Sequence, residues 1–309
     1  MLFRSVSFRP EKKPSGFVGL TETTAFSARQ ARAFLRAAGF GPCRVTAMTG
    51  GLWNRLFRVE AAGRCLSLKH YARLPPGLLY PNLPAAEALA LQRLAGLGVA
   101  PDLVGFWPAA RLLIYAHIDG AHWSGDPVPV AQVLDRAAAA DCTGFRALAT
   151  TPAAILAEGD ALFARCSPDD LTRAWQDQRP AAVVIAAAPL SLVHTDVGAG
   201  NLIGAGGGLR LIDGQCPGAG DAAEDVCSFL SPAVQAVNHR PPLTPDQRSR
   251  FLAAVARPDL AARALAMEPF FAYRHAAYCC LRRQMAPDLR PLYTAAAMAA
   301  LPAAADRYP

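Results

Sequence analysis

Residues 192–213 read LVHTDVGAGNLIGAGGGLRLID, and this stretch decides how the rest of the chain is interpreted. It carries three oxygen-bearing side chains at fixed intervals. Asp196 and Asn201 lie five residues apart, and Asn201 and Asp213 lie twelve apart. Between the last two, the sequence is apolar, then rich in glycine, then apolar again. That pattern predicts two short antiparallel strands joined by a turn.

The predicted hairpin pairs residues 202–204 with residues 210–212 around a turn at residues 206–208. In this register Asn201 stands opposite Asp213. Directly opposed residues in an antiparallel pair have Cβ atoms about 4.5–5.5 Å apart, a separation that one cation can bridge. Because Mg²⁺ binds one or two protein oxygen ligands and completes its octahedron with water and phosphate oxygens, the stretch predicts a site for phosphoryl transfer.

The length and composition suit a large folded core. The chain has 309 residues, 52% of them hydrophobic, which is enough for one large domain or two lobes. The longest apolar run, residues 181–193, is interrupted by Pro189 and is shorter than the roughly 20 residues of a membrane span. The N-terminal residues lack the apolar segment of a secretory signal. The cysteines form no Cys-x-x-Cys pair, so we expect reduced thiols and a cytoplasmic location. Because no apolar run is long enough, we expect no association with a membrane.

The net charge of +7 is unevenly distributed along the chain. Residues 1–119 carry 15 basic and 6 acidic side chains, whereas residues 120–309 carry 16 and 18. Because the basic residues are dispersed and form no dense run, we expect a solvated surface and no nucleic-acid partner. Arginine supplies nearly all of this charge, and Lys69 is the only lysine beyond the N-terminal tail.

The first part of the chain has the periodicity of a small antiparallel sheet. Residues 27–30 have the form of a capping box, which predicts a short helix after them. In residues 45–69 apolar and polar side chains alternate, so we expect three strands, with Gly50 and Gly51 in the first turn and Lys69 ending the third.

Two features of this part have both a structural and a functional interpretation. Gly50 and Gly51 either form a simple hairpin turn or let the backbone close over ATP phosphates, with Lys69 supplying a point charge to them. Pro84 suits the first position of a helix. Glu87, in the first turn of that helix, is either a surface acid that favours the helix N-terminus or a partner that fixes the Lys69 ammonium.

A change in composition near residue 116 predicts two lobes. Residues 112–115 form an apolar strand candidate, and alanine-rich helical patterns dominate beyond them. We expect a poorly ordered tail over residues 1–24, an N-terminal lobe over residues 25–116 and a C-terminal lobe over residues 117–309. Helices are predicted near residues 129–140, 152–164, 180–188, 222–230, 245–256 and 267–284.

The order of these motifs resembles the aminoglycoside phosphotransferase and choline kinase family, the small-molecule branch of the protein-kinase-like fold. The resemblance covers roughly residues 45–285, and residues 194–213 are its most specific part. It implies an α+β fold of two lobes, with a small antiparallel sheet and one main helix in the first and mostly helices in the second. It is carried by Gly50, Gly51, Asn54, Arg55, Arg58, Val59, Lys69, Glu87, His194, Asp196, Asn201, Leu211, Ile212, Asp213, Gly220, Asp221 and Asp225.

The resemblance implies a role for each matched position. Asp196 would accept or orient the proton of the substrate hydroxyl, and Asn201 and Asp213 would hold Mg²⁺. Lys69 would bind the ATP phosphates, positioned by Glu87, and His194 would support the catalytic loop. The remaining nucleotide contacts would come from Gly50, Gly51, Asn54 and the backbone near Ala116 and His117, the last two meeting adenine.

The sequence departs from the family pattern at several places. The family often has glycine between the histidine and the aspartate, and a second histidine two residues after the aspartate, where this chain has Thr195 and Gly198. The metal-binding aspartate is commonly followed by an aromatic residue, whereas Asp213 is followed by Gly214 and Gln215. None of these changes removes a metal ligand or the base.

Two other nucleotide-binding motifs do not fit. Residues 198–204 resemble a dinucleotide fingerprint, but that motif must open a helix, and the glycine-rich residues that follow argue against one. A Walker A loop needs glycine directly before lysine, and none of the three lysines has it.

We therefore predict an ATP- and Mg²⁺-dependent kinase that acts on a hydroxyl of a small molecule, such as an amino alcohol like choline or ethanolamine, an amino sugar or an aminoglycoside. An uncharged sugar and a non-catalytic kinase-like nucleotide-binding protein stay open as alternatives. The sequence does not determine the oligomeric state. Candidates for lining the acceptor pocket are Asp221, Glu224, Glu268, Tyr273, Arg274, His275 and Tyr278.

Overall fold

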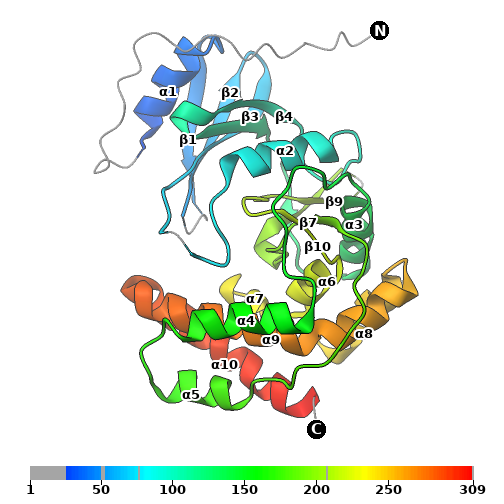
Figure 1. The fold of residues 1–309 in the computed structure, drawn as a ribbon. Helices are drawn as coiled ribbons and strands as arrows, with labels where there is room; N and C mark the ends of the chain where they lie inside the picture. The colour runs from blue at the N-terminus through cyan, green and yellow to red at the C-terminus, as the bar shows by residue number, and fades with distance from the viewer. Residues whose placement is uncertain (1–25, 50–52, 76, 207, 308–309) are drawn as a thin grey trace.

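The structure is a computed structural model that describes residues 26–49, 53–75, 77–206 and 208–307. The predicted tail over residues 1–24 and the two glycines Gly50 and Gly51 lie outside these ranges. An N-terminal sheet flanked by two helices sits above a larger, mostly helical region (Figure 1). None of the helices in the described ranges is both long enough and apolar enough to cross a membrane.

The N-terminal sheet has five antiparallel strands, which are the three predicted over residues 45–69, the strand candidate at residues 112–115, and a fifth strand that was not predicted. Phe57 and Val59 of the second strand point into the core beneath the first helix, whose capping box at Ser27 is confirmed. Ala62 and Gly63 both have positive φ and form the two-residue turn to the third strand. The strand order is β1 (Cys43–Met48), β2 (Arg55–Ala61), β3 (Arg64–His70), β5 (Leu112–Ala116), β4 (Leu103–Trp107).

The two N-terminal helices cover opposite faces of this sheet (Figure 1). The helix α1 (Ala28–Ala37) packs Phe34 against Trp107 with ring centroids 5.2 Å apart. The helix α2 (Pro84–Leu94) begins with proline at its first position, as predicted, and carries Glu87 in its first turn on the side facing the third strand. Lys69 and Glu87 therefore meet below the sheet.

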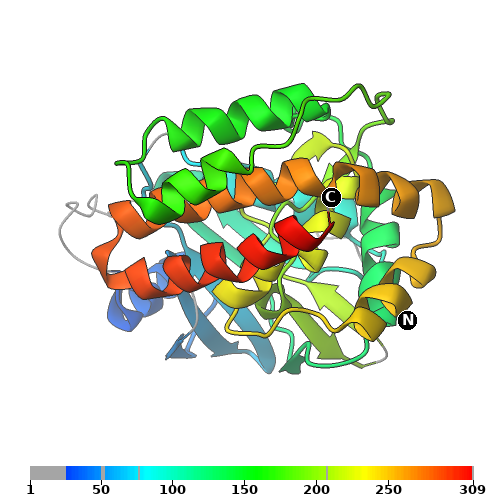
Figure 2. The same cartoon turned by 90° about the horizontal axis from the view of Figure 1, so that it is seen from below.

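The C-terminal region is built around a long helix, α9 (Pro258–Met285), which is buried along much of its length. It packs against α4 (Pro152–Phe163), α6 (Ala223–Leu230) and α10 (Arg290–Arg307), and Figure 2 shows α4, α9 and α10 side by side. The other helices are α3 (Val128–Ala138), α5 (Asp170–Asp177), α7 (Pro232–Val237) and α8 (Pro245–Ala254). Two small sheets complete the region: β7 (Ser191–Val193) with β10 (Gly218–Gly220), and β6 (Ala121–His122) with β8 (Leu202–Ala205) and β9 (Gly208–Leu211).

The hairpin over residues 202–211 is present, but its predicted register is wrong by one residue. Leu202 pairs with Leu211 and Ala205 with Gly208, so the turn holds two residues and not three. Asn201 consequently lies opposite Ile212, whose N–H donates to the Asn201 carbonyl at 3.0 Å. Asp213 follows with φ of +60°, so the backbone turns sharply at the predicted metal ligand.

The helix predicted near residues 180–188 is also absent. The segment is bounded by Pro180 and Pro189, and most of its side chains are exposed, including Val184 at 101%. Alanine-rich sequences form stable short helices mainly where an apolar face packs against something, and this segment has no such face. The elements that the sequence pattern did not reveal are β4, β6, β7, β10, α5, α7 and α10.

Candidate active site

A cavity of about 460 Å³ lies between the N-terminal sheet and the helical region. Its walls include the predicted phosphate-binding lysine, Lys69, and the predicted catalytic and metal-binding residues Asp196, Asn201 and Asp213. The sequence places these four residues up to 144 positions apart, and the fold brings them to one surface. Asn54 lines the same cavity.

Lys69 is the centre of a buried charge network. Its ammonium lies 2.6 Å from a Glu87 carboxylate oxygen and also pairs with Asp213, while Lys69 and Glu87 are only 1% and 2% exposed. Burial alone would lower the pKa of Lys69, but the adjacent carboxylates of Asp213 and Glu87 outweigh it and raise that pKa. The Tyr71 hydroxyl donates to Glu87, and its ring lies 4.8 Å from the Lys69 nitrogen. The lysine is thus held charged in one orientation.

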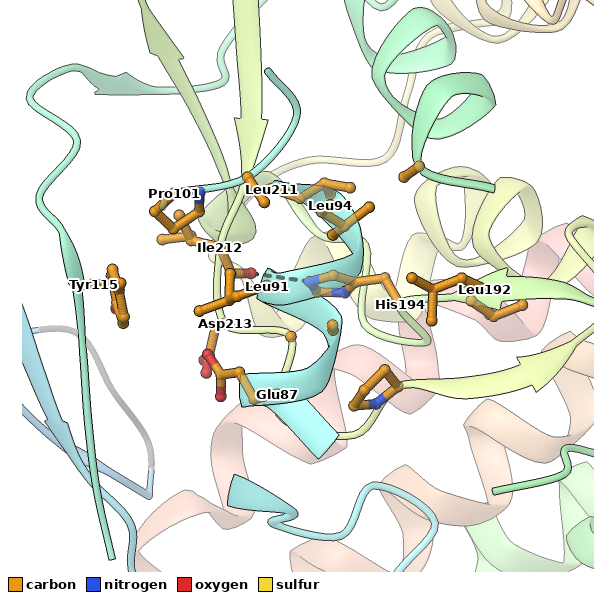
Figure 3. Close-up of a pocket in the computed structure, with 16 residues that line it drawn as sticks. Glu87, Leu91, Leu94, Pro101, Tyr115, Leu192, His194, Leu211, Ile212 and Asp213 are labelled. Atoms are coloured by element: carbon orange, nitrogen blue, oxygen red, sulfur yellow. Dashed lines mark hydrogen bonds between the residues drawn. The ribbon is translucent and has the colours of Figure 1, made fainter. Parts of the chain in front are cut away.

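A second, smaller cavity of about 30 Å³ lies behind this network (Figure 3). Glu87 and Asp213 are neighbours at its edge, and most of the wall is apolar, with Leu91 and Leu94 among its residues. The apolar wall keeps water away from the buried Lys69–Glu87 ion pair, so the attraction between these two charges is weakly screened. Burial accordingly raises the pKa of Glu87, against the opposing effect of Lys69.

Asp196 and Asn201 form the ends of a short loop and contact each other. The Asn201 amide nitrogen donates to the Asp196 backbone oxygen at 2.9 Å and to its carboxylate oxygen at 3.2 Å. Burial and the nearby Asp213 charge raise the pKa of Asp196 to about 6, although the Asn201 bond opposes this shift. Asp196 is therefore ionised at neutral pH while remaining a better proton acceptor than an ordinary carboxylate.

This loop is anchored from below by Asp225 of α6. One carboxylate oxygen of Asp225 accepts from the His194 backbone N–H and the other from the Thr195 backbone N–H, both at 2.8 Å. Thr195 has φ of +72°, a conformation that is unfavourable for a β-branched residue. Its hydroxyl donates to the Cys216 carbonyl at 3.1 Å. The glycine of the family pattern would be unstrained there, so this chain holds a strained threonine through hydrogen bonds.

Asn238, at the end of α7, anchors the other half of the loop. Its side-chain oxygen accepts from the Gly200 N–H at 2.8 Å, and its amide nitrogen donates to the Val234 carbonyl at 2.8 Å. A Cβ atom at Gly198 or Gly200 would lie 2.1 or 2.4 Å from this side chain. Both glycines are therefore required for the close approach between the loop and α7.

Asn54 takes part in an amide network that joins the two parts of the molecule. Its amide nitrogen donates to Gln215 at 2.6 Å, and its oxygen accepts from Asn82 at 2.7 Å and from the Ala72 N–H at 3.1 Å. Gln215 lies two residues after Asp213, the predicted metal ligand, where the sequence departs from the family pattern. The network thus connects Ala72, just after the third strand, to the segment that carries Asp213.

In the segment predicted to meet adenine, the N–H groups of Ala116 and His117 both already donate to backbone carbonyl groups. The Ala116 N–H donates to Asp102 at 2.8 Å, and the His117 N–H donates to Cys65 at 3.1 Å. The His117 ring nitrogen Nδ1 lies 2.8 Å from the Ser67 hydroxyl. Neither Ala116 nor His117 lines the large cavity. An adenine contact there would need a group other than these two N–H donors.

The donor set at the predicted metal site suits Mg²⁺. Asp213 presents a carboxylate, and Asn201 uses its amide nitrogen toward Asp196, which leaves its amide oxygen as a ligand. Hard oxygen donors of this kind, few in number, are what Mg²⁺ takes when phosphate and water complete its coordination.

Of the residues predicted to line the acceptor pocket, only His275 and Tyr278 do so. The others are turned into the helical core and engaged there. Glu224 pairs with Arg274 at 2.5 Å, and Asp221 pairs with Arg263 at 2.6 Å. The remaining two, Glu268 and Tyr273, bond to Arg248 and Asp160.

No family model matches this chain, and no curated protein matches its sequence. Solved structures do match it. A choline/ethanolamine kinase family protein from Mesorhizobium loti is 19% identical with a TM-score of 0.63, covering 90% of this chain and 94% of that one. The choline kinase LicA from Streptococcus pneumoniae is 14% identical with a TM-score of 0.61, covering 90% and 99%. A spectinomycin phosphotransferase, in complex with ADP and spectinomycin, is 10% identical with a TM-score of 0.59, covering 92% and 99%.

The chain has the fold of the choline kinases and aminoglycoside phosphotransferases. At sequence identities of 10–19%, this similarity shows a shared fold and no more. The prediction of a bilobal, kinase-like α+β fold is confirmed, with the antiparallel sheet first and the helical region second.

Within this kinase-like fold, sequence reasoning missed the residues that support the loop. The resemblance includes Asp225 but assigns it no role, Gln215 stands out only as a departure from the family pattern, and Asn82 and Asn238 carry no signal of their own. Asp225 sits in a helix as one acid among many, so only its burial and its two N–H partners reveal its function. The one available signal for Asn238 was indirect: Gly198 and Gly200 in the loop indicate that another segment approaches it closely.

Proposed function

We propose that this protein is a kinase that transfers the γ-phosphoryl group of ATP to a hydroxyl group of a small molecule. The convergence of Lys69, Asp196, Asn201 and Asp213 on one cavity carries this proposal. Phosphoryl transfer depends mainly on positioning and on neutralising phosphate charge, and these side chains supply a base, a fixed cation and two metal ligands.

Asp196 is the proposed base. The acceptor oxygen forms a bond to the γ-phosphorus while the bond from that phosphorus to the bridging oxygen breaks, so that ADP leaves. Asp196 takes the hydroxyl proton during this step and later releases it to solvent. Its pKa of about 6 makes the carboxylate available at neutral pH and close in proton affinity to the working pH.

Lys69 is the proposed phosphate ligand, and Glu87 keeps its ammonium in place. Asn201 and Asp213 would hold Mg²⁺, which neutralises phosphate charge when it is bound. The ADP bound to the spectinomycin phosphotransferase supports a nucleotide in the equivalent fold. Further nucleotide contacts from Gly50, Gly51, Asn54, Ala116 and His117 stay predictions, as do the acceptor classes of amino alcohols, amino sugars and aminoglycosides.

An ATP-consumption screen over small hydroxyl compounds tests the proposal. The Asp196→Asn variant should lose about 10²- to 10⁴-fold in turnover on any acceptor found, because the proton acceptor is removed while the side-chain volume is kept. Asp177→Asn is the matched control, because Asp177 is an exposed acid at the end of α5. Turnover that survives in Asp196→Asn would contradict the assigned base. Binding of ATP and Mg²⁺ without turnover on any compound would favour the non-catalytic alternative.

A further inference from the structure

Three side chains that can bind a metal meet at one end of the N-terminal sheet. Cys65 is the second residue of β3, and His117 and Asp119 come directly after β5. One ligand atom of each residue lies within 4.8 Å of those of the other two. Within the described ranges, no other group of three or more His, Cys, Asp or Glu side chains brings its ligand atoms this close together. None of the three lines the large cavity, so the proposed kinase chemistry leaves this cluster without a role.

The strand pairing fixes two of these residues. Because β3 and β5 pair Leu66 with Ala116, Cys65 stands directly opposite His117, and the His117 N–H donates to the Cys65 carbonyl at 3.1 Å. Opposed residues in an antiparallel pair place their side chains on the same face, with Cβ atoms about 4.5–5.5 Å apart. The thiol and the imidazole are therefore brought together by the sheet itself.

Ser67 orients the imidazole. Its hydroxyl oxygen lies 2.8 Å from His117 Nδ1, while Nε2 of the same ring lies 3.4 Å from Asp119 Oδ1. A histidine that binds a metal commonly donates the N–H of its other ring nitrogen to a neighbouring oxygen, which directs the free nitrogen to the metal. The His117 side chain is 10% exposed, and Ser67 is buried beside it, so the ring has little room to turn away.

The donor set suits Zn²⁺. Thiolate, imidazole and carboxylate are its usual ligands, at about 2.0–2.3 Å, so two atoms bound to one tetrahedral ion lie about 3.3–3.8 Å apart. The distance from His117 Nε2 to Asp119 Oδ1 falls in this range. The other ligand atoms need to approach by about 1 Å at most, which rotation of the Cys65 and Asp119 side chains can provide. Mg²⁺ prefers oxygen donors, so the thiolate distinguishes this cluster from the predicted Mg²⁺ site.

Arg58 competes for the Asp119 carboxylate. Its Nη1 lies 2.6 Å from Asp119 Oδ1, and its Nε lies 3.6 Å from a Glu60 oxygen. The Arg58 and Asp119 side chains are 37% and 68% exposed, so solvent screens their attraction and the pair is weak. A divalent cation can displace the guanidinium from Asp119, and Glu60 is close enough to keep it paired.

We propose that Cys65, His117 and Asp119 bind Zn²⁺, with a water molecule as the fourth ligand. The ion would join the start of β3 to the segment after β5, where the chain passes from the N-terminal sheet to the helical region. It would therefore stabilise the folded protein. The proposal does not depend on the proposed kinase function, which is carried by residues that line the large cavity.

Co²⁺ is the probe, because it takes the same ligands as Zn²⁺ and its complexes absorb light. Cobalt bound to a thiolate gives a charge-transfer band in the near ultraviolet, and tetrahedral Co²⁺ gives strong visible bands. The full-length protein, freed of metal with a chelator, should show both, and Cys65→Ser should lose the charge-transfer band. Cys43→Ser is the matched control, because Cys43 is another half-buried free thiol of the N-terminal sheet, and it should keep both bands. Absence of the band from the wild type, or its survival in Cys65→Ser, would overturn the proposal.

The other two ligands are tested by competition with a chromophoric chelator, which gives the Kd for Zn²⁺. His117→Asn and Asp119→Asn should each raise this Kd about tenfold or more. His122→Asn is the matched control for the histidine, because His122 is exposed nearby on β6 and lies outside the cluster, and it should leave the Kd unchanged. Thermal midpoints measured with a chelator present show that each variant is folded. An unchanged Kd in His117→Asn would indicate binding by the thiol alone and would overturn the three-ligand site.

Arg58→Gln provides a variant that should bind the metal more tightly. Removing the guanidinium frees the Asp119 carboxylate and takes away a positive charge, so the Kd for Zn²⁺ should fall about threefold or more. An unchanged Kd would contradict a metal at Asp119. A large excess of Mg²⁺ should leave the charge-transfer band in place, and loss of the band would contradict a site built on a thiolate.

Discussion

Replacing Asp225 with asparagine should loosen the loop that carries the proposed base, Asp196, without changing the size of the side chain. Asp225 is 6% exposed, and its two carboxylate oxygens accept the backbone N–H groups of His194 and Thr195 at 2.8 Å each. Asparagine has one carbonyl oxygen, so one of these N–H groups would face an amide NH₂ group and lose its partner. Thr195, which has a positive φ, depends on this bond to stay in place.

The expected loss of stability follows from these contacts. A hydrogen bond to a charged acceptor contributes about 1.5–3 kcal/mol, and leaving a buried donor unsatisfied costs about 1–3 kcal/mol. Burial raises the pKa of Asp225 to about 7, against the effect of the two N–H bonds, so the neutral amide recovers part of the penalty of burying a charge. We therefore expect the free energy of unfolding to fall by about 2–3 kcal/mol, which leaves a protein of ordinary stability folded.

Urea unfolding measures this change through the midpoint at an unchanged slope. The acceptor turnover of Asp225→Asn should fall as well, because Asp196 is displaced with the loop. Asp177→Asn, an exposed substitution of the same kind, should change the free energy of unfolding by less than about 0.5 kcal/mol. If Asp225→Asn changed the free energy of unfolding by no more than the control does, the anchoring role of Asp225 would be refuted.

Two further predictions concern the loop and the sheet. Gly198→Ala should lower the free energy of unfolding by about 1–3 kcal/mol, because the new Cβ would lie 2.1 Å from the Asn238 side chain. Gly204→Ala is the control and should change this free energy by less than about 0.5 kcal/mol, since the nearest atom would lie 3.7 Å from its Cβ. Equal free energies of unfolding for the two variants in urea would contradict this packing. Burial lowers the pKa of His70 to about 4, so its contribution to stability is complete above about pH 6.5 and is lost as the pH falls toward 4. Since His70 is partly exposed beside Phe26, we expect His70→Gln to reduce the acid-induced loss of stability by about 1 kcal/mol, and an unchanged pH profile of unfolding would contradict it.

Much of the fold follows from local sequence patterns. The alternation of apolar residues predicts the first three strands. The capping box at Ser27 predicts α1, and the proline at its start predicts α2. Each of these signals is local in the sequence. The spacing of residues 192–213 predicts the hairpin but not its register. Register depends on whether the turn holds two or three residues, and three consecutive glycines permit both.

The rest of the site depends on contacts between distant residues. Asp225 and Asn238 hold the loop between His194 and Asn201, and Gln215 holds the segment after Asp213. Nothing in the sequence around these three residues indicates these contacts. The prediction that Asp221, Glu224 and Glu268 line the acceptor pocket is wrong for the same reason. Their charges are neutralised by arginines that lie 20 to 50 positions away in the chain, and a sequence pattern cannot show which acids are paired.

The central claim is that Asp196 is the base of a phosphoryl transfer to a small-molecule hydroxyl group. The most direct measurement follows the labelled γ-phosphoryl group of ATP into an isolated acceptor product, with the wild-type protein, Asp196→Asn and Asp177→Asn compared at saturating Mg²⁺. We predict labelled product with the wild type and Asp177→Asn, and at least about a hundredfold slower formation with Asp196→Asn. Equal product formation by all three proteins would contradict the claim.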